Sequence, residues 1–133
     1  MAREEGDELE WRTYGLSLAH RLKLLRGLRG MSQEKLSEVS GIHRNQVSNL
    51  ERNVSRDEGS ADPRLSTIFK LARALDVPPE VLIPNVHERV TGKSSESASD
   101  TAFSAIEVDL TKRLGVGNSH QVREAVETLP SIE

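Results

Sequence analysis

The chain has 133 residues, of which 35% are hydrophobic, and it contains no cysteine. This size suits one small domain with appendages rather than a multidomain enzyme, and the lack of cysteine excludes disulfides, zinc–cysteine sites and thiol nucleophiles. Residues 1–16 hold two basic and five acidic side chains, a net charge of −3. Residues 17–84 hold eleven basic and eight acidic side chains, a net charge of +3, and residues 85–133 hold five basic and eight acidic side chains, a net charge of −3. A basic centre between acidic ends is compatible with a core that binds a polyanion.

The first residues, MAREEGDELE, are acidic and lack the apolar stretch of a secretory signal. No uncharged apolar stretch approaches the roughly 20 residues that a membrane span requires. We therefore expect a cytoplasmic protein in which residues 1–16 form an acidic N-terminal arm.

Five helices are predicted within residues 17–84, because apolar residues recur there at helical spacing. Gly30 and Gly41 are suited to end the first and second helices, and Ser32 is suited to cap the second. The predicted elements are residues 17–29, 33–40 and 43–52, a fourth helix opened by Asp62 and Pro63, and a short helical turn in PPEVLIP that ends at Pro84.

The predicted core positions share one face of each helix. Leu36 and Val39 are expected to be buried in the second helix, and Val47 and Leu50 in the third. The first and fourth helices contribute Leu18, Ala19, Leu22 and Leu25, and Leu65, Ile68, Leu71, Ala72 and Leu75, followed by Val77. Leu24 and Leu28 are expected off the core face, with Trp11 and Tyr14 preceding them unassigned, and residues 54–62 are expected to form an exposed loop.

The third predicted helix carries a polar face opposite Val47 and Leu50. Arginine and asparagine side chains on such a face match the guanine N7/O6 and adenine N6/N7 edges in a major groove. A capped helix, a turn glycine and a second helix with a polar face together indicate a helix-turn-helix. Without these neighbours, the polar face of the third helix would be interpreted as an ordinary solvent-exposed surface. The side chains on this face are Arg44, Asn45, Ser48, Asn49 and Arg52.

Residues 18–84 resemble the Xre/Cro family of bacterial and phage repressors. The resemblance is carried by Arg26 in the first helix, by SQEKL at the start of the second and by Gly41 at the turn. It continues through Val47, Ser48, Glu51 and Arg52 and through DPRLSTIFKLARALDVPPEVL. It implies an all-α, five-helix repressor-like helix-turn-helix domain over residues 17–84 that places its third helix in the major groove of duplex DNA.

The resemblance also implies roles for single residues. Contacts with bases fall on Arg44, Asn45 and Asn49, with further contributions from His43 and Ser48. A contact with the DNA backbone falls on Gln33, at a helix N-terminus that is suited to hold phosphate. Arg26 and Glu51 match a structural ion pair. Further backbone contacts are expected from Arg52, Arg56 and Arg64.

Three residues depart from the family's pattern. Ser37 stands where a small alanine is usual, Lys35 replaces the glutamate of a capping box, and His43 replaces the serine that caps the third helix. These changes predict weaker helix ends. The loop at residues 54–62 is also longer than is usual in the family.

The C-terminal third is predicted to contain two segments. Residues 85–100 are polar and rich in small side chains, which favours a flexible linker. Residues 101–133 are predicted to form a helical tail, since an apolar stripe runs along it at helical spacing. We expect the tail to pack against another protomer and strengthen dimerisation. The alternatives are packing against its own domain and a disordered acidic tail. The stripe consists of Phe103, Ile106, Leu110 and Leu114.

The sequence thus predicts a sequence-specific regulator of transcription that binds double-stranded DNA. A single recognition helix reads few base pairs, so we expect a homodimer on a palindromic operator. No motif of an enzyme, metal site or phosphate-binding loop is present, and we expect no catalysis, metal or other cofactor. The alternative is an antitoxin or bridging module whose main partner is a protein.

Overall fold

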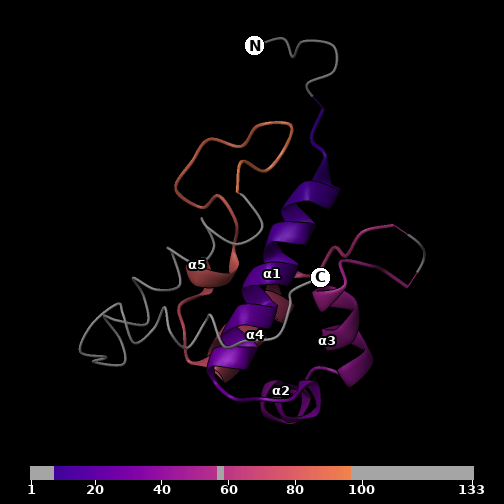
Figure 1. The fold of residues 1–133 in the computed structure, drawn as a ribbon, viewed down its shortest axis with the longest axis vertical. Coiled ribbons are helices and arrows are strands. Elements are labelled where there is room, and N and C mark those ends of the chain that lie inside the picture. The colour runs from indigo at the N-terminus through magenta and orange to yellow at the C-terminus, as the bar shows by residue number, and fades with distance from the viewer. Residues whose placement is uncertain (1–7, 57–58, 97–133) are drawn as a thin grey trace.

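The computed structural model describes residues 8–56 and 59–96, and Figure 1 shows the helices in these ranges. They are α1 (Trp11–Leu28), α2 (Gln33–Ser40), α3 (Arg44–Glu51), α4 (Leu65–Leu75) and α5 (Pro79–Leu82). The described residues contain no strand, which confirms the all-α, five-helix prediction. None of the described helices is long and apolar enough to cross a membrane.

Helix α1 begins six residues before the predicted start at Ser17. Trp11 Nε1 donates a hydrogen bond to the carbonyl oxygen of Ala61, 2.7 Å away, and the indole ring stacks on Tyr14 with 6.2 Å between ring centroids. The bond to distant Ala61 and the local stacking on Tyr14 stabilise the additional turns.

The core is filled mainly by leucines, and α1 contributes two faces to it. Figure 1 shows α1 between α3 and α5, and it contacts both helices. Leu24 is therefore buried and Leu28 packs partly against the core, so the prediction that both lie off the core face was wrong. The largest completely buried side chains are Leu22, Leu25, Leu36, Leu71, Leu75, Leu82 and Val47.

Helix α2 has the predicted bounds and caps. Ser32 Oγ accepts a hydrogen bond from the Lys35 amide at 3.0 Å, and Gly41 takes the left-handed conformation with φ 78°. Leu36 is fully buried, but Val39 is 49% exposed and was wrongly placed in the core. The short helix packs on α3 and α4 through the face centred on Leu36, which leaves Val39 on its outer flank.

His43 and Ser37, which depart from the family's pattern, both make hydrogen bonds at the turn between α2 and α3. The Asn45 amide donates to His43 Nδ1 at 3.1 Å, so the imidazole caps α3 in place of a hydroxyl. The Ser37 hydroxyl donates to the carbonyl oxygen of Ile42 at 2.5 Å, which ties α2 to the start of α3. Both substituted side chains thus make hydrogen bonds at this turn, and the weakening predicted there stays a prediction.

Helix α4 begins at Leu65, with Arg64 rather than Asp62 at the N-cap. Leu65 is 65% exposed and was wrongly placed in the core stripe. It lies four residues before Phe69, which is also exposed, so both side chains share an outer flank of the helix. Within the preceding loop Ala61 is buried, which differs from the uniformly exposed loop expected there.

Residues 85–96, here called the strap, run back along the N-terminal half of α1 (Figure 1). The Tyr14 hydroxyl donates to the carbonyl oxygen of Thr91 at 2.8 Å and accepts from the Thr91 amide at 3.1 Å. The Ser94 amide donates to Thr13 Oγ1 at 2.8 Å. Hydrogen bonds rather than apolar burial therefore hold this polar segment, which the sequence predicted to be a flexible linker.

Candidate nucleic-acid interface

Helix α3 presents a polar outer face while its inner face is fixed in the core. Val47 and Leu50 are buried, as predicted. The opposite side carries the five predicted side chains. Three of them are exposed, namely Arg44, Asn45 and Arg52, and two are half-buried, namely Ser48 and Asn49. His43, at the N-cap, is exposed as well. One rigid helix thus brings together all the residues to which base contacts were assigned.

Arg44 is paired at the surface with an acidic residue of α2. Its Nε lies 3.8 Å from Glu34 Oε1, and both side chains are largely exposed. Exposed pairs of this kind contribute little to stability. The guanidinium is therefore available to exchange this carboxylate for an acceptor on a ligand.

Two other residues of this face contact each other. Arg52 Nη2 donates a hydrogen bond to Asn49 Oδ1 at 2.8 Å. The carbonyl oxygen of an amide has two lone pairs, so Asn49 Oδ1 keeps one acceptor site while its NH₂ group is turned away from Arg52. This arrangement retains the adjacent donor and acceptor that reading an adenine edge requires.

The predicted ion pair between Arg26 and Glu51 is present and joins α1 to α3. Arg26 Nε lies 2.6 Å from Glu51 Oε2, and Arg26 Nη2 donates to Glu51 Oε1 at 3.0 Å. Arg26 Nη1 also donates to the carbonyl oxygen of Met31 at 2.8 Å. The Glu51 side chain is 3% exposed. This bidentate geometry is strong and directional, and it fixes the position of α3 relative to the end of α1.

Gln33 is connected to the same ion pair. Its Nε2 donates to Glu51 Oε1 at 3.2 Å, which the sequence did not indicate. The Gln33 side chain therefore holds the first turn of α2 against α3. The same side chain is predicted to contact the DNA backbone. Helices α1, α2 and α3 therefore meet at the carboxylate of Glu51.

Asn53, immediately beyond α3, is a residue that the sequence analysis missed. It has a φ of 54° and a buried side chain. Its Nδ2 donates to the carbonyl oxygen of Arg12 at 3.0 Å, and its Oδ1 accepts from the Ala61 amide at 3.2 Å. A Cβ atom on Gly15 would lie 2.3 Å from Asn53 Oδ1. A glycine inside the pattern of α1 and an asparagine after α3 were the available signals.

The remaining predicted residues are less closely tied to this face. Arg56 and Arg64 are exposed on the segment between α3 and α4. Phe103, Ile106, Leu110 and Leu114 lie outside the described residues. Within residues 8–56 and 59–96, no group of three or more histidine, aspartate or glutamate side chains is placed to hold a metal ion.

Part of this chain is similar to known helix-turn-helix proteins. Residues 22–82 match a family model described as helix-turn-helix. The chain is 36% identical over 59 residues to the control protein C.SmaI of Serratia marcescens, and the match covers 44% of this chain and 63% of that protein. The crystal structure of the restriction-modification controller protein C.AhdI from Aeromonas hydrophila shares 36% identity with a TM-score of 0.45, and the match covers 52% of this chain and 96% of that chain. Helices α2 and α3, which both lie within the matched residues 22–82, are the two helices of this helix-turn-helix.

Proposed function

We propose that this protein is a sequence-specific regulator of transcription that binds double-stranded DNA and has no catalytic role. The outer face of α3 carries the proposal, because it presents arginine and asparagine side chains from a helix whose inner face is fixed by Val47 and Leu50. An α-helix with its side chains is about 10 to 12 Å in diameter, which suits the major groove of B-DNA, about 12 Å wide. The protein acts on DNA in the cytoplasm.

Each part of the interface has its own task in this proposal. Arg44, Asn45 and Asn49 contact base edges, with Ser48 and His43 at the margins of the contact. Gln33 contacts the backbone from the N-terminus of α2, where helix dipole and amide donors favour a phosphate. Arg52, Arg56 and Arg64 supply further positive charge along the backbone.

We further propose that two copies bind a palindromic operator. The α3 helices of a dimer would enter successive major grooves about 34 Å apart. The names of two relatives, a control protein and a restriction-modification controller protein, support a role in controlling genes, including those of a restriction-modification system. Because the chain covers only 63% of the length of C.SmaI, this role is part of the proposal.

Selection from random duplex DNA with the purified full chain tests the proposal. We expect an enriched inverted repeat with half-sites one helical turn apart, and loss of enrichment when Asn49→Ala is used in the same selection. A Val39→Ala variant is the matched control, since this exposed side chain lies on α2 outside the proposed interface. Failure of the wild-type chain to enrich any sequence would contradict the proposal and favour the alternative, a module whose main partner is a protein.

A further inference from the structure

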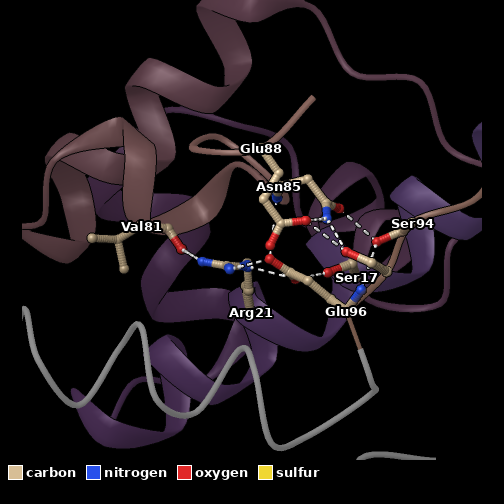
Figure 2. Close-up of polar contacts among 8 residues, drawn as sticks. Ser17, Arg21, Val81, Asn85, Glu88, Ser94 and Glu96 are labelled. Carbon is tan, nitrogen blue, oxygen red and sulfur yellow. Dashed lines mark hydrogen bonds and ion pairs between the residues drawn. The ribbon is translucent and has the colours of Figure 1, made fainter. Parts of the chain in front are cut away.

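A buried ion pair closes the strap onto α1, outside the proposed DNA interface. Arg21 and Glu96 have side chains that are 4% and 3% exposed. Arg21 lies in α1 and Glu96 is at the end of the strap, so the pair joins segments separated by most of the domain. Figure 2 shows the Arg21 guanidinium between the Glu96 carboxylate and the carbonyl oxygen of Val81 in α5.

The Glu96 carboxylate is completely surrounded by donors. Its Oε2 accepts from Ser17 Oγ and from Arg21 Nε, the latter at 3.1 Å, and its Oε1 accepts from Arg21 Nη2 and from the Asn85 amide, the latter at 3.1 Å. Four donors match the roughly four lone-pair sites of a carboxylate. A charge removed from water requires this compensation, and loss of one partner would leave the other charge buried without it.

The hydrogen bonds around Glu96 favour the ionised form of its carboxyl group. Burial acts to raise the pKa of Glu96, but the hydrogen bonds from Arg21, Ser17 and the Asn85 amide, together with the charge of Arg21, outweigh it. The pKa therefore lies below its ordinary value of 4.5. At neutral pH the strap is closed by a full ion pair.

The turns of α1 that hold the strap also hold the end of α3. On one side, Thr13 and Tyr14 bind the strap through Ser94 and Thr91. On the other side, the Arg12 carbonyl oxygen accepts from Asn53. The Asn53 side chain in turn accepts from the Ala61 amide at 3.2 Å. A continuous set of packed groups therefore runs from Glu96 through α1 to the residue that terminates α3.

We propose that Glu96 is a positioning residue for α3: by binding Arg21 it closes the strap, and the closed strap holds the first turns of α1 against Asn53 at the C-terminal end of α3. The part of this inference that concerns DNA rests on the proposed function. Opening the strap loosens the support of the recognition face without touching any residue on that face.

The strap's amide hydrogens offer a direct test in the full chain without DNA. In Glu96→Gln we expect hydrogen exchange at the Thr91 and Ser94 amides to accelerate by about tenfold, and the Ala61 amide to follow. The Leu36 amide of α2, which bonds to the Ser32 carbonyl oxygen at 3.0 Å, should change much less. Glu88→Gln is the matched control, because it also removes one negative charge from the strap. The Glu88 side chain contacts Asn85 and Ser95 rather than Arg21.

Acceleration at Thr91 and Ser94 without acceleration at Ala61 would overturn the proposal, as would equal effects of Glu96→Gln and Glu88→Gln. If Glu96→Gln does not fold, Glu96→Asp decides the question, since it keeps the charge and shortens the side chain. It must then accelerate the same amides by a smaller factor. An Arg21→Gln and Glu96→Gln double variant removes both charges and should recover part of the thermal stability lost by either single variant while the strap amides stay fast.

Affinity for the selected DNA provides the readout that a purely local role would not change. We expect Glu96→Gln to weaken DNA binding by about tenfold relative to Glu88→Gln at a temperature where both are folded. Equal affinity of the two variants would refute the coupling to α3. Absence of DNA binding by the wild-type chain would refute the proposed function instead, and the exchange at Ala61 would still decide whether the strap supports α3.

Discussion

Replacing Gly15 with alanine tests the contact between α1 and the residue that ends α3. In an open helix this change is favourable by about 1 kcal/mol, because glycine loses more backbone entropy than alanine. Here the new Cβ atom would lie 2.3 Å from Asn53 Oδ1 and 3.1 Å from Asn53 Cγ. The amide of Asn53 must therefore move.

The magnitude follows from what that movement breaks. Asn53 makes hydrogen bonds to the Arg12 carbonyl oxygen and the Ala61 amide, each contributing about 1 kcal/mol, and leaving a buried amide without a partner costs about 1 to 3 kcal/mol more. After the gain in helix propensity of about 1 kcal/mol is subtracted, Gly15→Ala should destabilise the domain by about 2 to 4 kcal/mol. The midpoint of thermal unfolding should fall by roughly 10 to 20 °C.

A double-mutant cycle in urea separates the steric effect from a general effect on α1. Asn53→Gly removes the obstructing side chain and tolerates the positive φ of 54°. In that background Gly15→Ala should stabilise the protein by about 1 kcal/mol, which reverses the sign of its effect in the wild type. If Gly15→Ala destabilises both backgrounds equally or stabilises the wild type, the Asn53 side chain does not obstruct a Cβ atom at position 15.

Four further outcomes are expected. Arg44→Ala and Asn49→Ala should each weaken binding to the selected DNA by about 1 to 3 kcal/mol and leave binding to random duplex DNA nearly unchanged in a titration at fixed salt. Removing either Arg26 or Glu51 should cost about 3 to 5 kcal/mol of unfolding free energy and the double neutral variant less than the sum, whereas strict additivity in a urea cycle would contradict their coupling. Because the pKa of Glu96 is lowered on folding, its contribution should be complete above its unfolded pKa and disappear as the pH falls through the folded one. Urea unfolding from about pH 7 to about pH 3 should show this loss in the wild type and not in Glu96→Gln. A chain that ends at Glu96 keeps the strap. If residues 101–133 assemble the dimer, this chain should sediment as a monomer under conditions where the full chain sediments as a dimer, whereas the same oligomeric state for both would argue against that role.

The helix-turn-helix could be predicted because its signals are local. Ser32 and Gly41 bound α2 within a few residues of the apolar side chains they accompany, and Val47 and Leu50 define which side of α3 is outward. The start of α1 could not be predicted in this way. Its first turns are stabilised by bonds from Trp11 to Ala61 and from Tyr14 to Thr91, and these partners are distant in sequence.

The strap was missed for a related reason. A segment held by hydrogen bonds to side chains has no apolar periodicity, so small polar residues such as Ser94 are indistinguishable from those of a linker.

The start of α4 was predicted too early because of a favourable local signal. Asp62 and Pro63 are suited to begin a helix, but the buried Ala61 and its bonds to Asn53 and Trp11 delay the helix until Leu65.

The placement of these contacts explains how a short helix can be rigid enough to read DNA. Helix α3 has only eight residues, and isolated helices of this length are not stable in water. Its C-terminal end is held to α1 at two places, by Glu51 through Arg26 and by Asn53 beside Gly15. Its N-terminal turn, with Arg44 and Asn45, projects from the domain beside α2. In helix-turn-helix proteins the N-terminal residues of the recognition helix meet the base edges. If α3 binds DNA as proposed, Arg44 and Asn45 would therefore meet the bases from a helix that is already ordered, and binding would carry little ordering cost.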